Sequence, residues 1–275
     1  MRKILLSIII VFLIAGGVFV FIQKSNYSVF SQSEKEALTA KVNPVVEETQ
    51  KKEETPTKTE EKLPQSYLLP VTFTSQAPYK KWDPDHEDAC EEASIITAHY
   101  YLQNRELTPE IADEEILRML DFQEKNYKER NKDLEAEETA KLAKDFYGYK
   151  KVEVLPVNSI EDIKKEIFKG NPVILPTAGR LLSGPLSLGM SPYYTCKPKC
   201  VAGDGGEGDG PLYHMLVAIG WDEREKKIIT NDPGTRHGEK FAFKYDVLLN
   251  ALHEWNGGNM NEGRSVMIIL PKEKL

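Results

Sequence analysis

Hydrophobic and polar positions divide the chain into three parts. Residues 4–22 form an uninterrupted apolar run without a charged side chain, which is long enough for one helix to cross a bilayer. Residues 24–65 are polar, with mixed charges and few large apolar side chains, and cannot bury enough apolar surface to offset the entropy cost of ordering. Apolar segments with regular spacing begin after this stretch. We therefore predict a transmembrane segment at 1–23, a disordered charged stalk at 24–65 and one folded domain at 66–275.

The residues that flank the apolar run predict its orientation. Arg2 and Lys3 precede it, and basic residues stay on the cytoplasmic side, so the folded domain is expected outside the membrane. A cleaved signal peptide is the alternative, but its apolar core is usually shorter and ends in a small-x-small site. Residues 23–27, Gln-Lys-Ser-Asn-Tyr, contain no such site, which favours an uncleaved signal anchor. The expected protein is a single-pass membrane protein with an extracytoplasmic domain, on a bacterial cell surface.

Within the folded domain, helical patterns come first and strand patterns dominate the end. Thr108-Pro109 and Ser159 are typical helix starts, and Gly148 and Gly170 typical helix ends. The predicted helices begin near residues 90, 109, 134, 160 and 245. The predicted strands cover residues 66–74, 152–155, 172–176, 214–221, 227–231, 241–243 and 266–270. This order predicts an α+β domain whose helical N-terminal part packs on a mostly antiparallel sheet.

Charge and cysteine content narrow the possible partners. The formal net charge is −7 and no Lys/Arg cluster offsets it, so no nucleic-acid partner is expected. Cys196 and Cys200 favour a short disulfide outside the membrane, with a zinc site or free thiols as alternatives. The acidic residues of 203–210 lack EF-hand spacing, and we predict no metal or other cofactor. Cys90 is left over and is a candidate reactive thiol.

The residues around Cys90 suggest a nucleophile. A helix is predicted to begin there, and its positive end would lower the pKa of the thiol and favour the thiolate. Gln76, fourteen positions earlier, could offer its side-chain NH2 group to an oxyanion beside the backbone N–H of Cys90. The simpler interpretations are a buried structural cysteine and a glutamine that hydrogen-bonds loop backbone.

The predicted strands contain candidates for a base that would deprotonate Cys90 and for a group that would orient this base. His214 begins an apolar strand directly after a Gly-rich loop, where a rigid scaffold can present a base to a cleft. Antiparallel pairing would bring Asp232, at the end of the return strand, beside His214. Asn231 is the alternative orienting group, but neighbouring strand residues point to opposite faces, so only one can serve. The simpler interpretations are a core histidine and a turn aspartate.

The order Gln, Cys, His, Asp, with these spacings, resembles the papain-like cysteine peptidases and, among them, the C39-like peptidase family. The resemblance rests on the following segments: Ser-Gln-Ala-Pro-Tyr at 75–79, Trp82, Ala-Cys-Glu-Glu-Ala-Ser at 89–94, Tyr-His-Met-Leu-Val-Ala-Ile-Gly-Trp-Asp at 213–222 and Asn-Asp-Pro-Gly at 231–234. It implies a papain-like fold in which Gln76 contributes to the oxyanion hole and Cys90 is the nucleophile. It further implies His214 as general base and acid and Asp232 as the residue that orients it. Residues 193–210 look like an insertion before the base, so substrate preference is not carried over.

The function expected from these features is that of a membrane-anchored, extracytoplasmic cysteine peptidase. Its partners would be peptide or protein substrates, cell-wall peptides among them, and the membrane through the N-terminal helix. Two alternatives stay open. The same site could serve a peptidoglycan amidase, an endopeptidase or a transpeptidase. The domain could also be a catalytically inactive papain-like module that binds partners at the cell surface.

Overall fold

The computed structural model describes residues 62–182, 212–235, 237–257 and 262–273, together with the backbone of two short N-terminal strands. The chain divides into two compact units, Met1–Thr59 and Glu60–Leu275, and each is described by itself. The expectations for Cys196, Cys200 and the acidic residues 203–210 lie outside the described residues, as does nearly all of the predicted stalk.

The N-terminal unit contains strands where the sequence predicts a helix. Strands β1 (Ile10–Ile14) and β2 (Gly17–Phe21) pair antiparallel, with Ile14 opposite Gly17. The segment is rich in β-branched and aromatic residues, and a short apolar run of this kind is compatible with either strand or helix. Among the described residues, none of the helices combines the length and the apolar character that crossing a bilayer requires.

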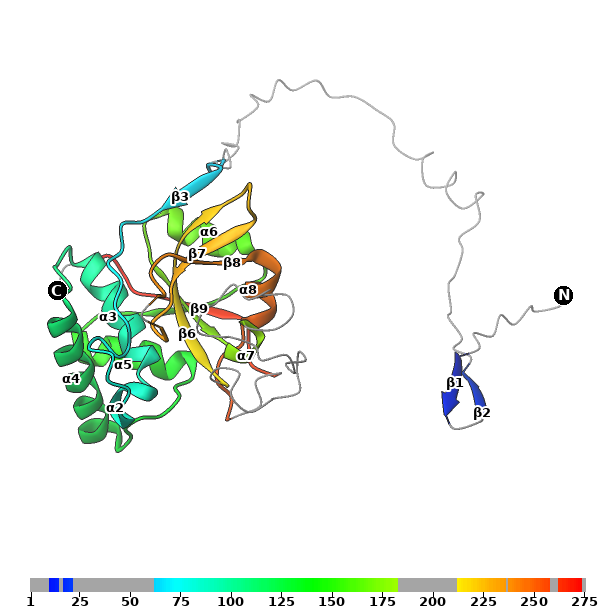
Figure 1. The fold of residues 1–275 in the computed structure, drawn as a ribbon, viewed down its shortest axis with the longest axis horizontal. Coiled ribbons are helices and arrows are strands. Elements are labelled where there is room, and N and C mark those ends of the chain that lie inside the picture. Colours follow the sequence, from blue (N-terminus) through cyan, green and yellow to red (C-terminus); the bar gives the residue numbers. More distant parts are fainter. Residues whose placement is uncertain are drawn as a thin grey trace, which may run out of the picture. The chain divides into compact units, whose positions relative to one another are not determined.

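An antiparallel sheet forms the centre of the larger unit (Figure 1). In the described part of the chain it has seven strands, in the order β4-β9-β5-β6-β7-β8, and β3 also pairs with β6. The strands are β3 (Ser66–Leu68), β4 (Glu153–Pro156), β5 (Val173–Thr177), β6 (His214–Asp222), β7 (Lys227–Asn231), β8 (Phe241–Lys244) and β9 (Val266–Ile269). The predicted α+β class with an antiparallel sheet is confirmed.

Strand β6 is the longest and lies inside the sheet. Its first half pairs with β5, its second half pairs with β3, and its other edge pairs with β7. Residues His214 to Trp221 are all buried, which explains the nearly continuous apolar run in the sequence. At Gly220 a Cβ atom would lie 2.4 Å from the Tyr67 carbonyl oxygen, so the close approach of β3 requires glycine.

The helices lie around this sheet. They are α2 (Pro84–Glu87), α3 (Cys90–Leu102), α4 (Pro109–Tyr127), α5 (Ala136–Tyr147), α6 (Ile160–Phe168), α7 (Gly179–Leu182) and α8 (Tyr245–Ala251). Helices α3, α4 and α5 gather on one side of the sheet, and α7 and α8 lie on the other (Figure 1). Helix α3 contacts β5 and β6 directly and is buried from Cys90 to Tyr100. The element that carries the candidate nucleophile is therefore a core helix.

Local signals explain where helices α4, α5 and α6 begin. The Thr108 hydroxyl accepts a hydrogen bond from the Ile111 N–H at 3.2 Å, and Ser159 forms a capping box with Asp162. Helix α5 begins after a capping box formed by Glu135 and Glu138, slightly later than predicted. The first strand is shorter than the predicted 66–74, and the short helices α2 and α7 are too brief to leave a periodic pattern in the sequence.

Candidate active site

Cys90 is the first residue of α3 and is only 4% exposed. The helix starts there because a short turn after α2 ends at Ala89, whose carbonyl accepts the first helical hydrogen bond from the Ala93 N–H at 3.1 Å. Backbone N–H groups in the first turn of a helix have no acceptor within the helix. The site thus combines a buried thiol with a helix N-terminus, as the sequence predicts.

His214 and Asp232 form a buried hydrogen-bonded pair. The imidazole Nε2 lies 2.7 Å from Asp232 Oδ1, and the two residues are 2% and 0% exposed. His214 is the first residue of β6, and Asp232 directly follows β7, so the β6–β7 hairpin brings the two together. Nε2 faces the carboxylate, so Nδ1 is the ring nitrogen on the side away from Asp232.

Asn231, the alternative orienting residue, is used elsewhere. Its Nδ2 donates to the Val71 carbonyl at 3.3 Å, and its Oδ1 accepts from the Lys240 N–H at 3.1 Å. Of the two neighbours, the structure brings Asp232 to His214, and Asn231 instead fastens the hairpin to flanking loops.

Gly234, the last residue of the Asn-Asp-Pro-Gly segment, lies against the His214–Asp232 pair. Its N–H donates to Asp232 Oδ1 at 3.0 Å. A Cβ atom at this position would lie 2.7 Å from His214 Cε1 and 2.9 Å from Nε2, closer than real Cβ contacts. The absence of a side chain therefore makes room for the imidazole ring, and the Asp-Pro-Gly tripeptide was the signal for it.

We expect Gly234→Ala to displace His214 from Asp232 and, in the peptidase that the sequence resemblance implies, to lower kcat by roughly 10²-fold, because a small displacement of a catalytic group is costly. Peptide hydrolysis by the purified variant measures this. Gly148→Ala is the matched control, since nothing lies within 4 Å of a Cβ there although φ is +79°, and it should cost stability without lowering kcat. A wild-type kcat in Gly234→Ala would show that the ring does not need this space.

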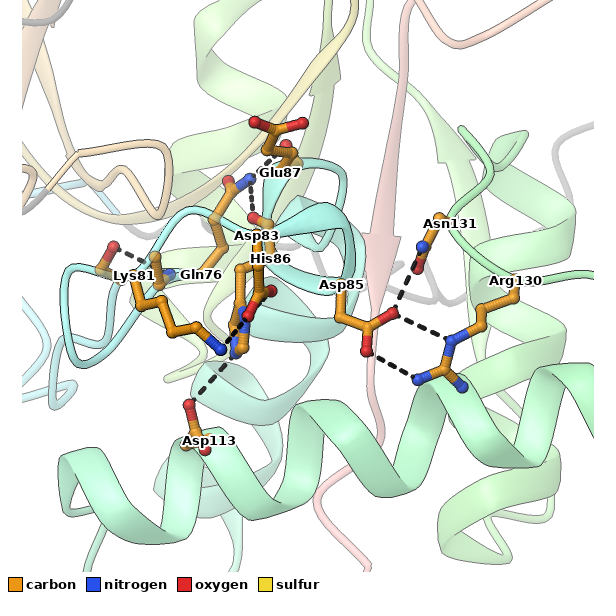
Figure 2. A network of polar contacts seen from close by, with 11 residues as sticks. Gln76, Lys81, Asp83, Asp85, His86, Glu87, Asp113, Arg130 and Asn131 are labelled. Carbon is orange, nitrogen blue, oxygen red and sulfur yellow. Dashed lines mark hydrogen bonds and ion pairs between the residues drawn. The ribbon is translucent and has the colours of Figure 1, made fainter.

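Gln76 is placed in the site but does not present its amide as expected. Its Nε2 donates to the carbonyl oxygens of His86 at 2.9 Å and Glu87 at 2.8 Å, so both amide hydrogens have acceptors (Figure 2). The reason is α2, whose C-terminal carbonyls lack partners within the helix and point toward Gln76. The Gln76 backbone N–H also donates to the Pro233 carbonyl at 2.9 Å, which ties this loop to the Asp232 turn.

A polar network holds α2 and the Gln76 loop against α4 (Figure 2). The His86 ring lies between two carboxylates, with Nδ1 2.6 Å from Asp83 Oδ1 and Nε2 3.1 Å from Asp113 Oδ1. Arg130 binds the Asp85 carboxylate through two hydrogen bonds of 3.0 Å. His86 is therefore a structural residue here. His99 is another, since it is stacked on Tyr147 and its pKa is lowered to about 4 by burial.

Several of the candidate site residues line one cavity of about 180 Å³. It is lined by Gln76, Glu87, Asp88, Cys90, Asp133, Leu212, Tyr213, His214 and Gly234. Cys90, His214 and Gln76 thus share a hollow, as the sequence predicts. Its acidic lining was not foreseen. Burial, reinforced by the nearby Asp88, raises the pKa of Asp133 to about 6.

The acidic groups around the thiol oppose the lowered thiol pKa that the sequence predicts. Burial raises the pKa of Cys90, and the nearby carboxylates of Glu91, Asp133 and Glu92 raise it further. The N-terminal end of a helix favours a thiolate, but three acidic groups and a low-dielectric environment outweigh a partial charge. The prediction of a lowered thiol pKa is therefore wrong for this arrangement.

The aromatic residues Trp221 and Trp82 lie in different environments. Trp221 is fully buried, stacks on Tyr67 and donates its indole N–H to the Pro64 carbonyl at 3.1 Å, so it belongs to the core. Trp82 is 38% exposed. Tyr193 and Tyr194 lie outside the described residues.

In this α+β domain, the first residue of a helix, Cys90, and the first residue of a strand, His214, line one cavity, and Asp232 is hydrogen-bonded to that histidine. Residues 68–257 match the model of the Peptidase_C39 like family, and the chain belongs to that family. The solved structures that match include the crystal structure of a Bacillus anthracis protein described as a C39-like peptidase. It is 16% identical, with a TM-score of 0.45, over 75% of this chain and 98% of the other. The comparison with curated proteins gives no match.

Proposed function

We propose that this chain is a cysteine peptidase that cleaves peptide bonds with Cys90 as nucleophile, His214 as general base and acid, and Asp232 as the residue that orients His214. The observation that carries the proposal is that His214, which is hydrogen-bonded to the buried Asp232, lines the same cavity as the lone described cysteine. Membership of the C39-like family supports a peptide substrate.

The proposed reaction uses these three side chains in turn. His214 Nδ1 takes the thiol proton, and Sγ attacks the carbonyl carbon of the scissile bond to form a tetrahedral oxyanion. Asp232 stabilises the imidazolium through Nε2, and the imidazolium then gives its proton to the leaving amine. A water molecule, deprotonated by His214, hydrolyses the acyl-enzyme and restores the thiol.

The oxyanion is assigned to the Cys90 backbone N–H, which lies at the first position of α3, with Gln76 Nε2 as the second donor. For this role Nε2 has to give up one of its two carbonyl acceptors when the substrate binds. Replacing Gln76 by Ala should lower kcat by about 10²-fold. It should also destabilise the fold by about 1–3 kcal/mol, because two carbonyls lose their donor. A lower Tm with unchanged kcat would make Gln76 a loop anchor only.

The experiment that tests the proposed function is hydrolysis of a mixture of unrelated peptides by the purified chain, with products read by mass spectrometry. Wild type should cleave and His214→Ala should not. His253→Ala is the matched control, because His253 Nδ1 contacts the Gly263 carbonyl at 3.1 Å and the residue does not line the cavity. Equal activity in wild type and His214→Ala, or no cleavage by wild type, would contradict the proposal.

We also propose that residues 4–22 anchor the protein in the cell membrane with the peptidase domain outside the cytoplasm. The uncharged apolar run and the preceding Arg2 and Lys3 support this orientation. Protease added to intact cells should then digest the domain, and the protein should sediment with membranes. A domain that is protected in intact cells would contradict the orientation.

A further inference from the structure

The thiol of Cys90 donates its hydrogen bond to the neighbouring carboxylate. Sγ lies 3.0 Å from Glu91 Oε2. The other carboxylate oxygen, Oε1, accepts the backbone N–H of Leu134 at 2.9 Å, in the segment just before α5. Glu91 is 0% exposed, so its carboxylate is fixed between the nucleophile and this backbone group.

Buried carboxylates are unusual, and this one belongs to a cluster. Glu92, the next residue of α3, is 2% exposed and accepts from Gln123 Nε2 of α4 at 2.5 Å. Burial raises the pKa of Glu91, and the charges of Glu92 and Asp133 raise it further. The titratable groups around the thiol and Glu91 come from several segments: Glu87 of α2, Asp88, Glu92 of α3, Asp133, Tyr213, His214 of β6 and Glu254.

The position of Glu91 gives it a direct effect on the nucleophile. A carboxylate oxygen can only accept a hydrogen bond from Sγ if the proton stays on sulfur, so the contact stabilises the neutral thiol over the thiolate. The Leu134 N–H holds the carboxylate in place, which prevents it from turning away. Glutamate is almost never fully buried unless it is paired, so a buried Glu91 against Sγ indicates a role beyond packing.

We propose that Glu91 is a positioning residue that holds the Cys90 thiol protonated at rest, so that the nucleophile forms only when His214 removes the proton. This inference rests on the proposed peptidase function. In the step, the S–H bond of Cys90 breaks and an N–H bond forms at His214 Nδ1, while the Glu91 side chain keeps its hydrogen bond from the Leu134 N–H. The expected consequence is a thiol that reacts slowly with general electrophiles near neutral pH and faster as pH rises.

The decisive variant is Glu91→Gln. Its Oε1 can still accept from the Leu134 N–H, but an NH2 donor replaces the acceptor that faces Sγ and would stabilise the thiolate. Glu92→Gln is the matched control, because it removes a buried carboxylate one residue away and keeps an acceptor for Gln123 without touching Sγ. Alkylation by iodoacetamide, an uncharged reagent, is followed on the Cys90 peptide by mass spectrometry from pH 5 to 10, with the full chain in detergent.

Wild type should show a midpoint above the ordinary thiol value of about 8.5. Glu91→Gln should react at least about tenfold faster at pH 7, with a midpoint lowered by about one unit or more. Glu92→Gln should change the rate by less than about threefold. The proposal is overturned if Glu91→Gln keeps the wild-type profile, or if both variants shift it equally.

A second variant keeps the test decisive. If Glu91→Gln does not fold, Glu91→Asp replaces it, because the shorter side chain keeps the charge but cannot reach both Sγ and the Leu134 N–H. A lowered midpoint in this variant supports the proposal, and an unchanged midpoint overturns it. The alkylation comparison does not require peptide cleavage, so a wild-type chain that cleaves no peptide would contradict the proposed function but not the Glu91 result.

Discussion

Cys90→Ala should fold like the wild type and hydrolyse peptides at least about 10⁴-fold more slowly. The reason is that the proposed mechanism passes through a bond between Sγ and the substrate, which alanine cannot form. Alanine also suits the first turn of the fully packed helix α3, so little stability should be lost. Initial rates with a cleaved peptide, and Tm values for both proteins, provide the measurement.

The double variant Cys196→Ala/Cys200→Ala is the control for thiol chemistry elsewhere in the chain. It should still form an acyl-enzyme on Cys90, detected as a mass increase on that peptide with a slowly hydrolysed ester substrate. Hydrolysis by Cys90→Ala at a rate near that of wild type would exclude Cys90 as the nucleophile and would favour the alternative of a binding module with a contaminating activity.

Asp232→Ala is expected to lower kcat by about 10²- to 10⁴-fold. Asp232 is completely buried and its Oδ1 accepts hydrogen bonds from both His214 Nε2 and the Gly234 N–H, so alanine removes the group that fixes the ring and stabilises its positive charge. Rates should be measured at several pH values, because a loss that persists across the whole range indicates misplacement of the ring.

Asp232→Asn separates orientation from charge. Its side-chain oxygen can accept the same two hydrogen bonds and keep the ring in place, but the charge that stabilises the imidazolium is lost, so kcat is still expected to fall by about 10²-fold or more. Equal losses in the Asn and Ala variants would mean that the negative charge is what His214 needs. A wild-type rate in Asp232→Ala would remove Asp232 from the mechanism.

Much of the fold could be predicted from the sequence because local signals agree with the tertiary structure. The cap at Thr108, the capping box at Ser159 and the turn at Gly148 fix helix ends by nearby hydrogen bonds, and all three are found where predicted. The apolar run 10–21 shows where local patterns fail to distinguish a strand from a helix, since its β-branched and aromatic residues suit both equally. The pairing of β3 with the far end of β6 depends on contacts distant in sequence, which no local pattern reveals.

The candidate site was predictable to the extent that it follows from topology. The β6–β7 hairpin brings Asp232 to His214, and antiparallel pairing made this foreseeable. The engaged amide of Gln76 was not foreseeable, because it depends on the four-residue helix α2. The charge environment of Cys90 was also missed. The two glutamates after it could have been recognised as first-turn helix residues that complement the dipole, but not as groups buried beside the thiol.

The proposed nucleophile and its proposed base belong to different layers of the domain. Cys90 comes from the helical side, whereas His214 and Asp232 come from one hairpin of the sheet. The His–Asp pair would therefore survive a loosening of α3 that separates Sγ from the ring. The activity of the proposed peptidase therefore depends on how tightly α3 packs on the sheet. Mild denaturation should abolish activity before the sheet unfolds. Hydrogen exchange at the α3 amides would detect this loosening.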